Sequence, residues 1–281
     1  MSSIKAISSV ENPDFVEPEA LDVPLVQHGL SVARFGTPLH YFREIGSTNS
    51  HARELAEAGA AEGTVVVAES QSHGRGRLGR RWESPPFKNL YLSIVLRPNL
   101  SPAHAAQITL VAAVALADAV EFYIPGQTAI KWPNDILVGG KKLAGILTEA
   151  SCDAELLHYV ILGVGINLNF ASGDMPDGIR RRATSLLEVT GKPIRRESFL
   201  QRLLQGIERC YGELEQTGFA AVATRWEDYF AWRGRRVRVE LLDQVTVGTA
   251  RGIDRDGALL LVDESGNEQR ILAGDVIPLE N

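Results

Sequence analysis

The chain has 281 residues, of which 44% are hydrophobic and 23% are charged, a composition typical of an ordinary globular protein. Its formal net charge of -6 excludes the overall positive field expected of a general nucleic-acid-binding protein. The 2 cysteines, Cys152 and Cys210, form no C-x-x-C pair, so neither a disulfide framework nor a zinc site is indicated.

The sequence predicts neither a targeting segment nor a membrane span. Residues 1–7 are too weakly apolar for a signal peptide. The most apolar long segment, residues 110–120, contains Asp118 and is far too short to cross a bilayer. We therefore expect a cytoplasmic protein without a membrane partner.

The first 40 residues are predicted to be irregular, with at most a short helix. They contain Pro13, Pro18, Pro24 and Pro38, several acidic residues and few apolar residues at regular spacing. The first clear helix follows this segment.

A short helix is predicted after Ser47, Thr48 and Asn49, whose side chains suit the first turn of a helix. Apolar residues then recur at helical spacing, and Gly59 ends the run. The three polar side chains therefore lie where a helix begins.

A glycine-arginine loop lies between two predicted strands, residues 64–68 and 90–96. Residues 74–82 read GRGRLGRRW and hold three glycines and four arginines. Glycine lets the main chain approach a ligand closely, and arginine presents a planar set of donors to carboxylate or phosphate. The loop is predicted to bind an anion, although a solvated basic turn is the commoner explanation for an arginine-rich turn.

The loop also satisfies the dinucleotide-binding pattern G-x-G-x-x-G, but its context excludes that function. A dinucleotide-binding loop opens a helix whose N-terminus receives the pyrophosphate. Here Pro85 and Pro86 follow, which cannot occupy a helix interior, and the next element is a strand. The sequence also lacks the H-R-D and D-F-G motifs of kinases and the Walker A motif.

The middle of the chain is predicted to alternate between helices and strands. A capping serine followed by proline begins an alanine-rich helix over residues 101–122. The predicted strands are residues 129–132, 135–138, 143–150 and 159–168. The predicted long helices are residues 197–217 and 219–232, separated at Gly218.

After Gly234 the pattern becomes that of a small β domain. Residues 237–241 alternate, Asp256 and Gly257 form a strong hairpin signal, and residues 258–262 are apolar. We expect a small barrel appended to an α/β core.

Polar side chains interrupt the apolar strands at three places. Residues 131–135 read KWPND and contribute Asn134 and Asp135, which suit hydrogen bonding and a magnesium-held phosphate, although a capped turn explains them equally well. Lys142 begins an apolar run, and a mobile solvated lysine is its simplest interpretation. Asn167 lies on an otherwise apolar strand, so its side chain requires a partner.

Taken together, these motifs resemble those of the biotin–protein ligases, which attach biotin to the carrier protein of acetyl-CoA carboxylase. The loop, KWPND, KLAGIL at residues 142–147 and GVGIN at residues 163–167 occur in the family's order, and Ser47, Thr48, Asn49 and Gln71 also match. The resemblance covers about residues 40–281. Bifunctional members carry an N-terminal winged helix-turn-helix domain, for which about 40 residues are too few. We expect a form without that domain and without specific DNA binding.

The resemblance implies a fold and a domain organisation. It implies a mixed central sheet with flanking helices, of the α/β or α+β class and similar to class II synthetases, with a C-terminal SH3-like β-barrel. The expected divisions are an irregular segment at residues 1–40, a biotin- and ATP-binding catalytic domain at 41–232, and the β domain at 233–281. Family members can dimerise through the sheet, and the sequence leaves a homodimer open.

The resemblance also implies the reaction and its residues. Biotin is activated by ATP with Mg²⁺ to biotinyl-5'-adenylate, from which a carrier lysine takes the biotin. The implied biotin-binding residues are Ser47, Thr48, Asn49, Gln71, Arg75, Gly76, Arg77 and Lys142. The implied nucleotide-binding residues are Arg80, Trp82, Asn134, Asp135 and Asn167, and the implied catalytic residues are Arg77, Lys142 and Asp135. Magnesium would arrive with ATP and contact Asp135, and Trp82 is equally well explained as a core residue.

Two other functions compete with this interpretation. A lipoate–protein ligase has the same general fold and activates a carboxylate in the same way, but the full glycine-arginine loop with KWPND favours biotin. A non-catalytic biotin-responsive regulator would need DNA-binding residues that the sequence does not offer.

Overall fold

The computed structural model describes residues 19–279, and the predictions for residues 1–18 lie outside them. The strands are β1 (Leu39–Phe42), β2 (Val65–Ala68), β3 (Leu90–Leu96), β4 (Thr128–Lys131), β5 (Asp135–Val138), β6 (Lys141–Cys152), β7 (Leu157–Ile166), β8 (Arg236–Leu241), β9 (Gln244–Ile253), β10 (Leu259–Val262), β11 (Glu268–Ile271) and β12 (Asp275–Pro278). The α-helices are α1 (Val23–Gly29), α2 (Thr48–Glu57), α3 (Ala106–Glu121), α4 (Asp177–Arg180), α5 (Leu186–Thr190), α6 (Arg196–Thr217) and α7 (Phe219–Tyr229). Three 3₁₀ turns are η1 (Arg77–Gly79), η2 (Pro102–His104) and η3 (Ser172–Asp174).

The main sheet has seven strands in the order β1-β2-β3-β7-β6-β5-β4. β1 and β2 are parallel, and every other neighbouring pair is antiparallel, which makes the sheet mixed as predicted. The long strands β6 and β7 form its centre, and β3 is buried along its whole length. The sheet therefore has a rigid middle on which side chains can be held in fixed positions.

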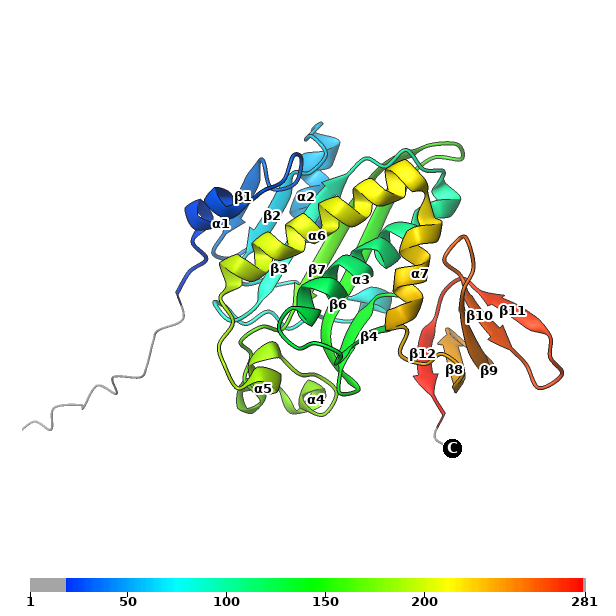
Figure 1. The fold of residues 1–281 in the computed structure, drawn as a ribbon. Helices are drawn as coiled ribbons and strands as arrows, with labels where there is room; N and C mark the ends of the chain where they lie inside the picture. The colour runs from blue at the N-terminus through cyan, green and yellow to red at the C-terminus, as the bar shows by residue number, and fades with distance from the viewer. Residues whose placement is uncertain (1–18, 280–281) are drawn as a thin grey trace, which may run out of the picture.

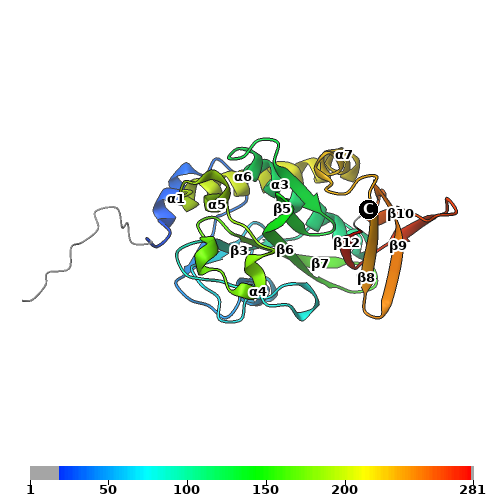
Figure 2. The same ribbon diagram turned by 90° about the horizontal axis from the view of Figure 1, so that it is seen from below.

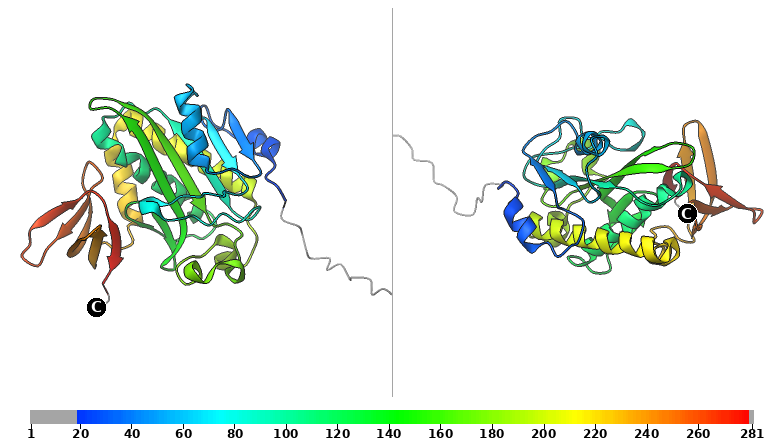
Figure 3. Two further views of the ribbon diagram at one scale, coloured as in Figure 1. Left: turned by 180° about the vertical axis from the view of Figure 1, so that it is seen from behind. Right: turned by 90° about the horizontal axis from the view of Figure 1, so that it is seen from above.

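The two faces of the main sheet are covered unequally. The long helices α3, α6 and α7 form a layer over one face and bury the larger apolar cluster (Figures 1 and 2). The opposite face carries α2, which packs on β2, β3 and β7 through a small cluster that includes Ala52, Ala56 and Ile161 (Figure 3). Because α2 has only 10 residues, much of that face remains available for a site.

The apolar helix is longer than the segment considered in the sequence. Residues Pro102–Glu121 form a 20-residue helical stretch that reaches the length and hydropathy of a membrane span, so the prediction that it is far too short was wrong. Of its most apolar window, 72% is buried inside the protein, where α3 packs on α6, α7 and the sheet. The hydropathy of this stretch therefore reflects a core position.

The C-terminal part is a five-stranded antiparallel sheet in the order β11-β10-β9-β8-β12. Within residues 19–279, β11 and β12 are opposite edges and do not pair, so the predicted barrel is open. The indole nitrogen of Trp132 donates to the carbonyl of Gly257 at 3.1 Å, and Gln107 donates to that of Arg255 at the same distance. These buried and partly buried bonds attach this sheet to the main body.

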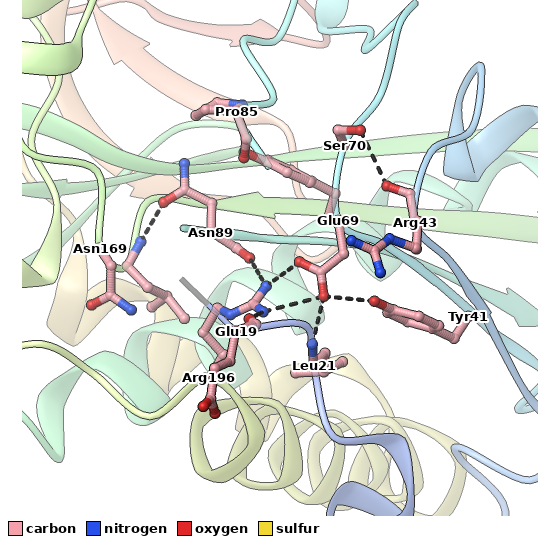
Figure 4. Close-up of polar contacts among 12 residues, drawn as sticks. Glu19, Leu21, Tyr41, Arg43, Glu69, Ser70, Pro85, Asn89, Asn169 and Arg196 are labelled. Atoms are coloured by element: carbon pink, nitrogen blue, oxygen red, sulfur yellow. Dashed lines mark hydrogen bonds and ion pairs between the residues drawn. The ribbon is translucent and has the colours of Figure 1, made fainter. Parts of the chain in front are cut away.

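A buried ion pair attaches the N-terminal part of the described chain (Figure 4). The guanidinium of Arg196 lies 2.6 Å from Glu69, and the two side chains are 7% and 1% exposed. Glu69 also accepts the backbone N–H of Leu21 at 2.6 Å and the hydroxyl of Tyr41 at 2.9 Å, while Arg196 donates to the carbonyl of Glu19 at 2.7 Å. Burial and the hydrogen bond to Glu69 raise the pKa of Tyr41 to about 12.

Most predicted elements are present with small shifts at their ends. Gly218 separates α6 from α7 with a φ of 81°, a conformation that glycine adopts without steric cost. The sequence did not predict β1, β9, β11, β12, α4 or α5. The short helix that the N-terminal segment allowed is α1, which begins at the capping side chain of Asp22; this carboxylate accepts the N–H of Leu25.

Candidate active site

A cleft of about 910 Å³ lies on the half-open face of the main sheet, and its wall includes both the glycine-arginine loop and the edge strand β12. Every residue predicted for the site lines this cleft: Ser47, Thr48, Asn49, Gln71, Arg75, Gly76, Arg77, Arg80, Trp82, Asn134, Asp135, Lys142 and Asn167. The fold thus gathers into one site residues that the sequence distributes over about 120 positions. Their roles remain predictions.

One end of the cleft is a network of neutral polar groups at the start of α2. The side-chain oxygen of Gln71 accepts the N–H of Thr48 at 2.9 Å and its hydroxyl at 3.1 Å. The hydroxyl of Ser93 lies 2.8 Å from that of Thr48 and 2.6 Å from Oδ1 of Asn49. Ser47 is buried and its side chain makes no capping bond. Such a network offers both donors and acceptors to a neutral polar ligand group.

The floor beneath this end is formed by glycine. Gly163 on β7 pairs with Leu147 on β6, and a Cβ atom on Gly163 would lie 2.0 Å from Oδ1 of Asn49. The absence of a side chain lets Asn49 lie directly on the sheet and donate to the carbonyl of Leu147 at 3.2 Å. The GVGIN motif therefore has a steric explanation here.

The glycine-arginine loop joins β2 to β3, as predicted, and closes on itself. The N–H of Gly76 donates to the carbonyl of Arg80 at 2.7 Å, and that of Trp82 to the carbonyl of Gly74 at 3.0 Å. At the tip, Leu78 is 57% exposed and has a φ of 55°, which costs a residue with a side chain conformational energy.

All four arginines of the loop line the cleft, and three of them, Arg75, Arg77 and Arg80, have different partners across it. Arg75 forms an ion pair with Glu149 on β6 at 3.0 Å, and Arg80 forms one with Asp275 on β12 at 2.8 Å. Arg77, between them, donates to the side chain of Asn134 at 3.0 Å. Within the described chain, no carboxylate lies at ion-pair distance from Arg77, so its charge is the least compensated of the three.

Arg77 and Asp275 show how the site distributes its charge. Burial lowers the pKa of Arg77, an effect that Asp135 and Asp275 oppose from a distance. Burial would raise the pKa of Asp275, but hydrogen bonds from Lys131 and Arg80 outweigh it and hold that pKa below its usual value. Asp275 is therefore a stable anion, whereas Arg77 is a desolvated cation suited to an anionic ligand.

An aromatic wall lies at the other end of the cleft. Trp82 rests on Gly145 and Gly165, which pair across β6 and β7; Cβ atoms there would lie 3.1 Å and 2.6 Å from its ring. The ammonium of Lys142 lies 5.4 Å from the ring centroid and 2.7 Å from Asp135. An indole fixed in this way offers a flat apolar surface next to a cation.

Two hydrogen bonds join the backbone of Lys142 to residues 182–184. Its N–H donates to the carbonyl of Arg182 at 2.7 Å, and its own carbonyl accepts the N–H of Thr184 at 2.9 Å. Lys142 lines the cleft, whereas the neighbouring Lys141 is exposed and does not. This arrangement differs from the mobile solvated lysine that was the simplest interpretation of the sequence.

The side chain of Asn167 has the partners that the sequence analysis required. Its amide nitrogen donates to the carbonyl of Thr184 at 3.0 Å, and its oxygen accepts from Asn89 at 3.4 Å. Asn134 also donates within the protein, to the carbonyl of Ile146 at 2.8 Å. Both asparagines therefore shape the wall of the cleft through internal bonds.

Four polar residues around the site were missed by the sequence analysis: Lys131, Ser93, Glu149 and Asp275. Lys131 belongs to KWPND but received no role, and its ammonium lies 2.6 Å from Asp275. Glu149 follows Gly145 and Leu147 at alternate positions of β6, a signal that could have placed it on the same face. Ser93 is the one polar side chain in the buried, apolar run of β3, the same signal that marked Asn167, whereas nothing local marks Asp275.

The described residues contain no group of three or more histidine, cysteine, aspartate or glutamate side chains that could hold a metal ion. The cleft combines a neutral polar end, a desolvated arginine, a lysine and an aromatic wall. It suits an elongated ligand that has a polar neutral head, an anionic centre and a flat ring.

Two family models match the chain. Residues 41–167 match the biotin/lipoate A/B protein ligase family, and residues 234–277 match the biotin protein ligase C terminal domain. Together the two matched segments cover both sheets.

Named relatives and solved structures agree with these matches. The bifunctional ligase/repressor BirA of Bacillus spizizenii is 39% identical over 260 residues, which cover 92% of this chain and 80% of that protein. A biotin–[acetyl-CoA-carboxylase] ligase of Paracoccus denitrificans is 36% identical over 79% of this chain and 93% of that protein. The biotin protein ligase of Aquifex aeolicus, solved with biotin and ATP, superposes with a TM-score of 0.74 at 31% identity, covering 86% of this chain and 99% of that chain.

Proposed function

The chain belongs to the biotin protein ligase family, and on that premise we propose that it activates biotin with ATP and transfers it to a lysine of the biotin carboxyl carrier protein of acetyl-CoA carboxylase. The observation that carries this proposal is that one cleft holds a neutral polar network beside Arg77 and Lys142. The network fits the ureido ring of biotin, and the two cations fit the carboxylate and phosphate that must meet.

In the first step a carboxylate oxygen of biotin attacks the α-phosphorus of ATP. The bond between the α-phosphorus and the oxygen that bridges it to the β-phosphorus breaks, and pyrophosphate leaves. Both reactants are anions, so their approach requires positive charge that is already in place. We assign this task to Arg77, which has no carboxylate at ion-pair distance among residues 19–279, and to Lys142. Asp135 holds the Lys142 ammonium at 2.7 Å and thereby positions it.

In the second step the amine of the carrier lysine attacks the carbonyl carbon of biotinyl-5'-adenylate, and AMP leaves. The adenylate is a mixed anhydride that water would hydrolyse. A glycine-rich loop that folds over the cleft excludes water and retains the intermediate until the carrier arrives. The bonds that close the loop from Gly74 to Trp82 support this role.

For the nucleotide, we assign Trp82 to the adenine ring and Asn134 and Asn167 to the shape of its pocket. If ATP binds as its magnesium complex, Asp135, which lines the cleft, would contact the ion, and the ion would offset part of the phosphate charge. The internal partners of Asn167 favour positioning of the wall over a direct contact with phosphate.

We further propose that the protein works in the cytoplasm and binds no specific operator. Its net charge of -6 supports the second statement, because specific DNA binding rests on many phosphate contacts. A gel-shift titration with candidate operators should give no sequence preference at moderate salt. A tight complex with one operator would refute this part.

The decisive experiment measures pyrophosphate release with ATP and either biotin or lipoate, followed by mass analysis of the carrier protein. Pyrophosphate should be released from ATP with biotin but not with lipoate, and the carrier protein should gain one biotinyl group on a lysine. Turnover with lipoate instead would assign a lipoate ligase, and binding of biotin without any turnover would assign a regulator.

A further inference from the structure

Glu149 lies on β6 just outside the wall of the cleft and receives donors from three residues. Arg53 on α2 lies 2.7 Å from Oε1, whereas Asn49 and Arg75 lie 2.8 Å and 3.0 Å from Oε2. The side chain is 22% exposed, so these charge-assisted bonds are partly shielded from water. A single carboxylate thus joins α2, the glycine-arginine loop and the main sheet.

The contact with Asn49 fixes which way its amide faces. The nitrogen of Asn49 donates to Glu149 and to the carbonyl of Leu147, so both of its protons are used. Its oxygen is thereby directed toward the hydroxyl of Ser93 at 2.6 Å, above Gly163. Without the carboxylate, one donor of Asn49 would lose its acceptor and the amide would lose its orientation.

The contact with Arg75 holds the N-terminal end of the glycine-arginine loop against β6. Arg75 is 40% exposed and also donates to the hydroxyl of Ser50 at 3.2 Å, so Glu149 is its charged partner. Arg77 follows two positions later and depends on the same short loop for its place. Glu149 therefore positions the neutral polar network through Asn49 and the loop through Arg75.

We infer that Glu149 is a positioning residue that sets the biotin end of the cleft and holds the glycine-arginine loop over it, although it contacts no substrate itself. The inference rests on the proposed function. It assigns Arg75 mainly to the anchoring of the loop and leaves Arg77 as the arginine that meets the anion. Loss of Glu149 should therefore impair the binding of biotin and the retention of its adenylate more than the binding of ATP.

The test compares Glu149→Met, which removes both acceptors at similar size, with Glu149→Gln, which keeps one. For Glu149→Met we expect KM for biotin to rise on the order of tenfold, with faster release of free biotinyl-adenylate and KM for ATP within about twofold of wild type. Glu149→Gln should lie between this variant and wild type. Arg53→Met is the matched control, because it removes a partner of Glu149 that belongs to neither the loop nor the polar network.

A double-mutant cycle isolates the pair. If Glu149 acts on the loop through Arg75, then adding Glu149→Met to Arg75→Met should not further speed tryptic cleavage at Arg77, Arg80 and Arg81, whereas KM for biotin should still rise through the lost contact with Asn49. The inference is overturned if Glu149→Met matches Arg53→Met, or if KM for biotin and ATP rise equally. Thermal unfolding shows whether each variant is folded, and Glu149→Gln carries the test if Glu149→Met is not.

The failure of the inference can be told apart from that of the proposed function. If the proposed function is wrong, the wild-type protein will release no pyrophosphate with biotin. Tryptic cleavage between Arg75 and Arg81 provides a readout that needs no turnover, and it should be faster in Glu149→Met than in Arg53→Met. Equal cleavage rates would contradict the anchoring of the loop.

Discussion

Gly163 and Asn49 occupy complementary volumes: a Cβ atom on Gly163 would lie 2.0 Å from Oδ1 of Asn49. Gly165, two residues further along β7, makes room for Trp82 in the same way. A Cβ atom on Gly165 would lie 2.6 Å from Cε2 of the indole ring. One glycine therefore makes room for the polar end of the cleft and the other for its aromatic wall. Replacing either glycine by alanine, which adds one methyl group, can therefore perturb one end of the cleft without the other.

We expect Gly163→Ala to raise KM for biotin and Gly165→Ala to raise KM for ATP, each by at least tenfold and with little effect on the other substrate. Neither glycine has a positive φ, so alanine is compatible with the backbone at both positions. Steady-state pyrophosphate release with each substrate varied in turn measures both constants. If both variants impaired both substrates alike, the assignment of the two ends would be wrong.

Lys142→Ala should lower the kcat of adenylation by about 10²–10³, whereas Lys141→Ala should leave it nearly unchanged. The ammonium of Lys142 is held beside Trp82 and Asp135, and removal of one preorganised donor from a developing negative charge typically costs this much. Lys141 is exposed next to it on β6 and serves as the control. Equal rates for the two variants would remove Lys142 from the site.

Arg77→Ala should loosen the retention of biotinyl-adenylate by about 1.5–3 kcal/mol, the contribution of a hydrogen bond to a charged group. The binding of biotin should change less, because the polar network of Thr48, Asn49 and Gln71 does not depend on Arg77. Adenylate released into solution can be followed by chromatography during single turnover. A variant that retains the intermediate as firmly as wild type would contradict our assignment of the anion site.

The contact of Asp275 with Lys131 and Arg80 should make stability depend on pH in the acid range. Its folded pKa is lowered, so the folded state prefers the ionised form, and the contribution is complete above the unfolded value of about 3.9. The contribution is lost as the pH falls through the lower folded pKa. Urea unfolding of wild type and Asp275→Asn from pH 6 to pH 2.5 should show a constant difference that shrinks below about pH 4. A difference that grew toward acid would have the wrong sign.

Arg196→Met should lower the free energy of unfolding by about 3–5 kcal/mol, because it leaves the buried carboxylate of Glu69 without its cation. Arg209→Met, which removes an exposed partner of Asp118, should cost less than about 1 kcal/mol. Denaturant titrations of the two variants give the comparison. Similar losses would mean that the buried ion pair of Arg196 and Glu69 contributes no more to stability than the exposed one.

The sequence was most informative where a pattern was long or a motif was local. The helix α6, the strands β3 and β7, and the loop between β2 and β3 follow from periodicity and turn residues. Short strands such as β11 and β12 depend on tertiary pairing, so local preference did not reveal them. The 3₁₀ turn and left-handed Leu78 at the loop tip likewise have no local signal.

For the site, residue types could be predicted better than their partners. The family resemblance assigned different roles to Arg75, Arg77 and Arg80, but the sequence did not show which partner each of them contacts. Their difference comes from Glu149 and Asp275, which belong to β6 and β12 and reach the loop only in the folded chain. Charge compensation is a property of the tertiary structure, so three similar residues in one loop have different environments.

Because the glycine-arginine loop is bonded to β6 at one end and to β12 at the other, the two sheets share the thermodynamic consequences of ligand binding. A ligand that stabilises the loop raises the apparent stability by RT ln(1 + [L]/Kd), and this gain extends to every segment that must be in place for the loop to form. The C-terminal sheet should therefore unfold together with the main sheet when the cleft is occupied. Its amide hydrogens would then exchange more slowly in the presence of biotin and ATP, although most of that sheet lies away from the cleft.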